Sequence, residues 1–70
     1  MFRNLYAEMG RAGFTYKTLA KDIGISEVVF GRKINGKVDW KVTEMIAIQQ
    51  LINKELGTSY TLDYLFSRPQ

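Results

Sequence analysis

Hydrophobic residues recur three or four positions apart along most of the chain, which is the spacing of amphipathic helices. The first run places Phe2, Leu5, Tyr6 and Met9 on one face of a helix that ends before Gly13. Further helices are predicted over residues 15–24, 26–35 and 42–56, and from residue 61 onward. No segment alternates hydrophobic and polar residues for long enough to predict a strand. We therefore expect an all-α fold of five helices.

Residues at the expected helix ends agree with these boundaries. Thr15, Ser26 and Thr61 can each accept a backbone N–H as an N-cap. Gly24 and Gly57 follow predicted helices and can adopt the left-handed conformation that ends a helix. Two short helices are thus predicted on either side of a turn at residues 24–26, which is the spacing of a helix-turn-helix.

This segment resembles the Cro and CI repressors of phages and bacteria. The matching residues are Leu19-Ala20, Ile23-Gly24-Ile25-Ser26, Phe30 and Ile34-Asn35-Gly36-Lys37, and the ending Leu62-Asp63-Tyr64-Leu65-Phe66 resembles the family's fifth helix. The resemblance covers about residues 3 to 66. It implies one five-helix, lambda-repressor-like domain over 1–66. Residues 67–70 follow the last predicted helix, and we expect them to be a frayed tail.

Two residues depart from the family pattern. The family usually opens the motif with Gln, whose amide holds a phosphate, and Tyr16 stands there in this chain. A phenol can still donate one hydrogen bond. The family also often buries an aliphatic residue at the place of Lys33. We expect Ile34 to take over that packing and Lys33 to extend its ammonium group outward.

The resemblance also implies how such a domain would meet double-stranded DNA. The third helix would lie in the major groove. Base edges would be read by Ser26, Glu27, Val28, Gly31 and Arg32. Arg32 can bind guanine, Glu27 can accept from cytosine, and Val28 can contact a thymine methyl. Phosphates would be held by Thr15, Tyr16, Lys17, Lys33, Asn35 and Lys37. Because the family tends to dimerise near its C-terminus, Tyr60, Tyr64 and Phe66 are the predicted contact of a homodimer on a pseudo-palindromic operator.

The distribution of charge favours a polyanionic partner. The net charge is +3, and residues 11–41 hold seven basic and three acidic side chains. The excess of positive charge therefore belongs to the predicted DNA-binding region. The pattern alone leaves a second hypothesis open, a protein-interaction module such as an antirepressor or adaptor with little DNA affinity.

Other classes of function find little support in the composition. The chain contains no Cys and no His, which removes thiolate metal sites and the commonest general base. We expect no catalytic site, no metal, no cofactor and no small-molecule ligand. No apolar run approaches the roughly 18 residues of a membrane span. The expected location is the cytoplasm.

Overall fold

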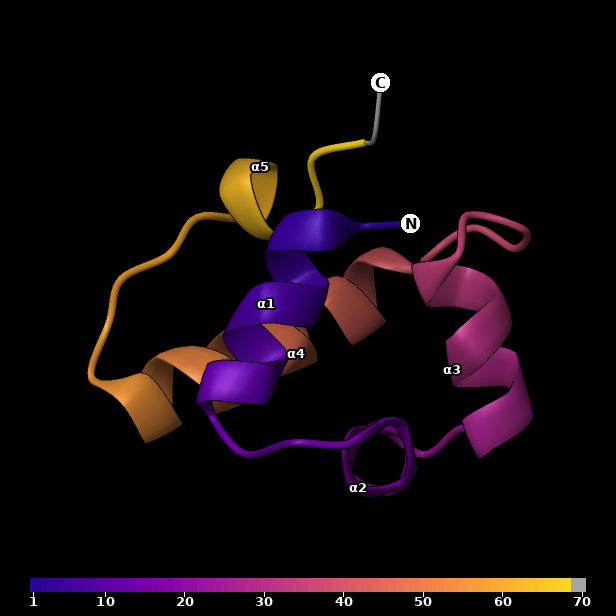
Figure 1. Cartoon of the computed structure of the whole chain (residues 1–70), viewed down its shortest axis with the longest axis horizontal. Coiled ribbons are helices and arrows are strands. Elements are labelled where there is room, and N and C mark those ends of the chain that lie inside the picture. Colours follow the sequence, from indigo (N-terminus) through magenta and orange to yellow (C-terminus); the bar gives the residue numbers. More distant parts are fainter. Residues whose placement is uncertain (69–70) are drawn as a thin grey trace.

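The computed structural model describes residues 1–68, and this part of the chain contains five α-helices and no strand. The all-α fold class is confirmed. The helices are α1 (Arg3–Arg11), α2 (Tyr16–Ile23), α3 (Glu27–Ile34), α4 (Val42–Leu56) and α5 (Leu62–Leu65). The longest helix, α4, contacts α1, α2 and α5, while α2 packs against α3 (Figure 1). The short α5 lies on α1 at the opposite end of the molecule from α2 (Figure 1).

The structure confirms predicted ends in four helices, α2, α3, α4 and α5. The hydroxyls of Thr15, Ser26 and Thr61 each accept the backbone N–H three positions later, at 3.1 Å. Gly24 ends α2 with φ 79°, and Gly57 ends α4 with φ 64°. Both angles lie in the left-handed region that favours glycine. These local contacts fix where each helix begins and ends.

The core draws on every helix. Fully buried side chains come from α1, α2, α3, α4 and α5 and include Leu5, Leu19, Phe30, Ile34, Ile48, Ile52 and Leu65. A chain of six aromatic rings in successive contact runs from the surface into this core, in the order Tyr6, Tyr16, Phe30, Trp40, Phe66 and Phe2. Neighbouring ring centroids are 5.3–6.4 Å apart, which is within the usual range of aromatic pairs.

Tyr6 does not belong to the buried face of α1 that its spacing predicts. Its side chain is 52% exposed. The buried face of α1 instead includes Glu8. The Glu8 carboxylate accepts a hydrogen bond from the Tyr64 hydroxyl at 2.7 Å and lies 3.4 Å from the Arg11 guanidinium. Sequence reasoning missed Glu8. The available signal is its position three residues after Leu5, on the apolar side of α1.

The predicted tail lies partly outside the described residues, because the structure covers 67 and 68 but not 69 and 70. Ser67 is held in place, since its hydroxyl accepts a hydrogen bond from the Asn4 amide at 3.1 Å. An exposed ion pair of 3.8 Å joins Arg68 to Asp39. The frayed tail over 67–70 stays a prediction.

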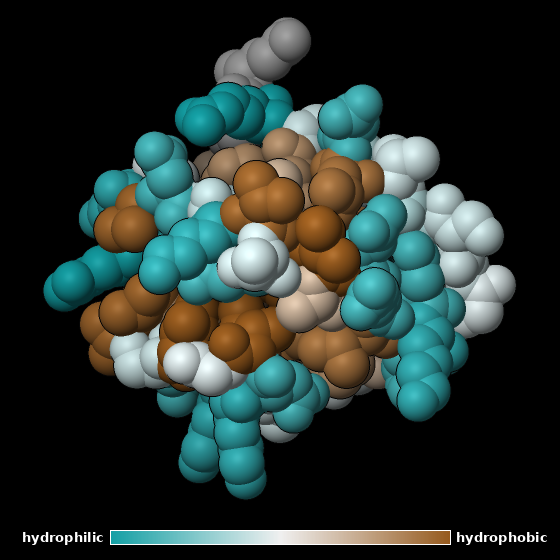
Figure 2. Space-filling view, turned by 180° about the vertical axis from the view of Figure 1, so that it is seen from behind, coloured by the Kyte–Doolittle hydropathy of each residue, from teal (hydrophilic) through white to brown (hydrophobic). Residues whose placement is uncertain are grey.

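Hydrophobic side chains are also exposed on the side of the molecule opposite to that seen in Figure 1. Figure 2 shows apolar surface gathered near the middle of this face. On α4 and the segment before it, the exposed large apolar side chains are those of Val38, Val42 and Ile46. No element of the described chain covers these three side chains fully.

Candidate nucleic-acid interface

A tight turn sets α3 against α2. Residues 24–26 connect the two helices, and the N–H of Ile25 donates to the carbonyl of Ala20 at 3.0 Å. Ala20 is buried, and its small side chain allows the helices to approach closely. Phe30 anchors the inner side of α3 in the core. With its inner side fixed in this way, α3 presents a defined outer face.

That outer face carries the predicted base-reading residues. Ser26, Glu27, Val28 and Arg32 are exposed, and Val28 is 65% exposed. Ser26 already uses its hydroxyl to cap α3. Three chemically different groups therefore remain free on the surface of α3, namely a carboxylate, an isopropyl group and a guanidinium.

Gly31 is half-buried and lies beside Tyr16 rather than open to solvent. A Cβ atom at Gly31 would sit 3.9 Å from two carbons of the Tyr16 ring, which is ordinary van der Waals contact. The ring of Tyr16 packs in turn on Phe30, with centroids 5.3 Å apart. Burial, followed by the nearby Tyr6, raises the pKa of the Tyr16 phenol above its usual value. The phenol is therefore protonated at neutral pH and can donate.

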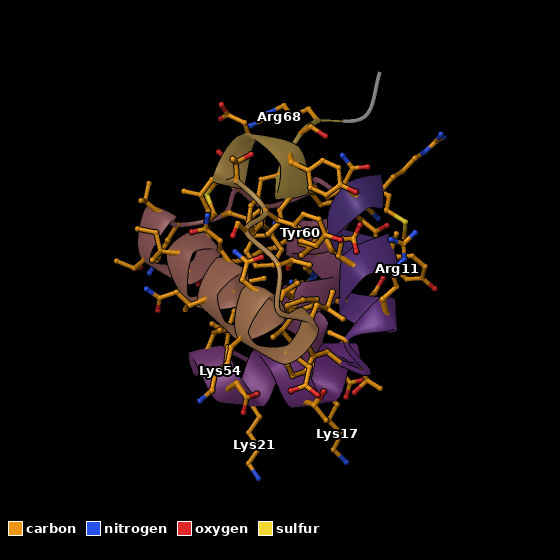
Figure 3. The ribbon with its side chains drawn as sticks, turned by 90° about the vertical axis from the view of Figure 1, so that its left-hand side faces the viewer. Arg11, Lys17, Lys21, Lys54, Tyr60 and Arg68 are labelled. Carbon is orange, nitrogen blue, oxygen red and sulfur yellow. The ribbon has the colours of Figure 1, made fainter. Side chains whose placement is uncertain are left out.

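Four of the six predicted phosphate contacts are exposed, and these four fall into two groups. Lys17 and Lys37 are exposed. Lys17 projects from α2 away from the body of the domain, and Lys21, which was not among the predicted contacts, projects the same way (Figure 3). The spacing of four residues between them gives the signal that sequence reasoning missed. Thr15 and Asn35 are exposed, but their side chains bond within the chain, since Thr15 caps α2 and the Asn35 amide donates to a carbonyl of α3 at 2.8 Å.

The prediction that Lys33 extends outward is wrong. Its side chain is only 6% exposed, and its ammonium group donates to the Glu44 carboxylate at 2.6 Å. The ammonium also lies 5.9 Å from the Trp40 ring centroid. Glu44 accepts the Lys41 N–H at 2.9 Å as well, so one carboxylate both pairs with Lys33 and begins α4. Because its charge is buried and paired, Lys33 is not a candidate for holding a phosphate.

Two competing effects act on the buried Glu44. Burial raises the pKa of its carboxyl, but the hydrogen bonds from Lys33 and from the Lys41 N–H, together with the charges of both lysines, lower it. The net pKa lies below its ordinary value. Glu44 is therefore ionised at neutral pH and keeps Lys33 in place.

Of the three aromatic residues predicted as a dimer contact, Tyr64 is 39% exposed, Tyr60 is half-buried and Phe66 is buried. Phe66 is 8% exposed and packs on Phe2 and Trp40, so its assignment to an exposed surface is wrong. The rings of Tyr60 and Tyr64 stack on each other with centroids 5.0 Å apart. The hydrogen bond to Glu8 raises the pKa of Tyr64, with burial adding to the effect.

Residues 1–68 hold no cluster of three or more residues that could bind a metal ion. Within the same residues, no helix is both long and apolar enough to cross a membrane. Comparison of the chain with protein-family models, with curated proteins and with solved structures finds no match. A functional interpretation therefore rests on the sequence and on the geometry of α2 and α3.

Proposed function

We propose that this chain is a sequence-specific DNA-binding transcriptional regulator, a Cro- or CI-like repressor of a phage or prophage. In this proposal residues 16–35 act as a helix-turn-helix, and α3 enters the major groove. The observation that carries the proposal is the outer face of α3, where Glu27, Val28 and Arg32 are exposed on a helix whose inner side is fixed. These three groups match different features of base edges.

Positive charge around α2 and α3 supports a phosphate-binding role for this part of the chain. Lys17 and Lys21 extend from α2, and Lys37 is exposed after α3. In the proposal these lysines fix the position of the domain on the duplex, and the Tyr16 phenol donates to a phosphate where the related family uses an amide. Lys33 has no part in this role, because Glu44 neutralises it.

The proposed regulator binds as a homodimer to a pseudo-palindromic operator with half-sites about one helical turn apart. The buried Phe66 is excluded from the dimer contact. Light scattering of the free protein and footprinting on DNA test the proposed assembly. A monomer that protects a single half-site would refute it.

Three substitutions test recognition by α3, with binding measured on a panel of single-base operator variants at two salt concentrations. The operator is first obtained by selection from a random DNA pool. Arg32→Ala should weaken cognate binding by about 1–3 kcal/mol and relax the preference at one base position per half-site. Lys37→Ala should weaken all sequences alike and make the salt slope shallower by about one unit. Glu27→Gln should change the preferred base at the contacted position from cytosine to adenine.

Each substitution has an outcome that contradicts its assigned role. A uniform loss with Arg32→Ala would show that α3 does not read sequence. Tighter, unselective binding with Glu27→Gln would mean that Glu27 only repels phosphates. An unchanged salt slope with Lys37→Ala would remove Lys37 from the phosphate contacts.

The exposed apolar side chains of Val38, Val42 and Ile46 favour a second candidate function, a protein-interaction module on the same scaffold. Apolar surface that is gathered in one exposed patch, as Figure 2 shows near the middle of one face, is typical of protein contacts. Salt separates the two functions, because phosphate binding makes log affinity fall steeply with log salt concentration. A chain that selects no sequence from the pool and binds DNA only weakly would favour the second function.

A further inference from the structure

Two tyrosines lie in succession beside α3. The ring of Tyr16, the first residue of α2, is the nearest side chain to the place where Gly31 would carry a Cβ atom. The ring of Tyr6 from α1 meets the Tyr16 ring edge-on, with centroids 6.4 Å apart and an interplanar angle of 78°. Because Gly31 has no side chain, the backbone of α3 faces the Tyr16 ring at this position with no side chain of α3 in between. Gly31, Tyr16 and Tyr6 therefore form a row that leads from α3 to α1.

The two phenol hydroxyls are free to bind a ligand. Among the side-chain hydrogen bonds of residues 1–68, one involves a phenol, and that phenol belongs to Tyr64. The rings of Tyr6 and Tyr16 help to line a surface hollow of about 320 Å³ between α1 and the start of α2. Its walls are Tyr6, Met9, Gly10, Phe14, Thr15 and Tyr16. Packing on Phe30 holds the Tyr16 ring, and contact with Tyr16 holds Tyr6.

We propose that Tyr6 is a DNA-contacting residue whose phenol, beside that of Tyr16, donates to a backbone phosphate of the strand bordering the groove that α3 enters. This inference rests on the proposed function. A helix with its side chains is about 10–12 Å across, and the major groove is about 12 Å wide. Groups that stand beside α3, rather than on its outer face, therefore meet the sugar-phosphate strand. Tyrosine hydroxyls are among the common donors to phosphate oxygens.

The chemistry of this contact differs from that of the lysines. A phenol is a neutral donor, so its contact positions the domain without neutralising a phosphate. Loss of the Tyr6 hydroxyl should lower affinity for every sequence while the dependence on salt stays the same. Loss of the Lys17 charge should change both affinity and salt slope. The pair of measurements distinguishes a phenol contact from a charge contact.

The test uses Tyr6→Phe in the whole chain on the duplex selected by the wild-type protein. Loss of one hydrogen bond to a charged phosphate should lower the affinity about 10-fold per half-site. The loss should be equal on all single-base variants and at both salt concentrations. Thermal unfolding should be unchanged, because the Tyr6 hydroxyl bonds no group in residues 1–68. Ser59→Ala is the control, since it removes an exposed hydroxyl from the loop between α4 and α5, on the opposite side of the molecule from α3 (Figure 1), and should leave DNA affinity unchanged.

A second measurement locates the contact on DNA. Uncharged methylphosphonate groups replace the phosphates of the duplex one at a time. At one position per half-site the replacement should weaken the wild-type protein but not Tyr6→Phe. If Tyr6→Phe binds every duplex as the wild type does, this inference fails while the proposed function stands. If the wild-type chain selects no sequence, the proposed function fails and the inference falls with it.

Discussion

Substitution of Lys33 by methionine tests the buried pair that ties the end of α3 to the start of α4. Lys33→Met keeps an unbranched apolar side chain but removes the ammonium group, so the buried Glu44 carboxylate loses its cation. Removing one partner of a buried ion pair typically costs about 3–5 kcal/mol. Glu44 still accepts the Lys41 N–H, so we expect a loss near 3 kcal/mol. A domain of this size has about 4–10 kcal/mol of stability in total, so the variant should be marginally folded.

Acidity changes the size of this effect in a predictable direction. In the wild type the pKa of Glu44 lies below its ordinary value of 4.5, so the ionised carboxylate contributes stability above that pH. This contribution is lost as the pH falls through the lowered pKa. In Lys33→Met burial still raises the pKa while the main lowering group is gone. The difference in stability between wild type and variant should therefore be largest near neutral pH and smaller in acid.

Urea unfolding at pH 7 and pH 4 measures both effects, followed by far-UV circular dichroism and by the fluorescence of Trp40, the single tryptophan. Addition of Glu44→Gln to Lys33→Met is the matched control. The amide oxygen can still accept the Lys41 N–H, and no charge remains buried, so much of the lost stability should return. If Lys33→Met is as stable as the wild type at pH 7, Lys33 does not pair with Glu44 and the reasoning is refuted.

Two other substitutions probe the packing of α3. Phe30→Ala empties a fully buried site and should cost about 3–5 kcal/mol, so its helical circular dichroism signal should be largely lost near 37 °C. A well-folded variant would contradict the burial of Phe30. Gly31→Ala should raise the stability by up to about 1 kcal/mol in thermal unfolding, because its Cβ meets Tyr16 at an ordinary 3.9 Å. The same variant should bind the selected duplex more weakly if α3 approaches the groove closely, and unchanged affinity would remove Gly31 from the interface.

The helix ends could be predicted because their causes are local. Thr15 and Ser26 each cap an N–H three residues away, and Gly24 needs only its own left-handed backbone angle. Such contacts act within one helical turn, so their signature is contained in a few consecutive letters. The exposure of Glu27 and Arg32 on α3 follows from the same short-range periodicity.

Burial that depends on distant partners could not be predicted in the same way. The charge on Lys33 favours solvent until Glu44, eleven residues later, is brought beside it. Phe66 is covered by Phe2, at the opposite end of the sequence. Tyr6 has the right spacing for the buried face, yet its side chain lies on the edge of that face. In each case the periodicity indicates on which face of its helix a side chain lies. The residues that cover that side chain depend on how the helices pack together.

The link between α1 and α5 has a consequence for amide hydrogen exchange. A helix of four residues is too short to persist alone, so α5 depends on its contacts with α1 and α4. On α1 these contacts include the Tyr64 hydroxyl on Glu8 and the Asn4 amide on the Tyr64 carbonyl at 2.9 Å. We therefore expect exchange at α5 to require this contact surface to open, so that the two helices behave as one cooperative unit. Amides of the first and last helices should respond together to denaturant, temperature or a bound partner.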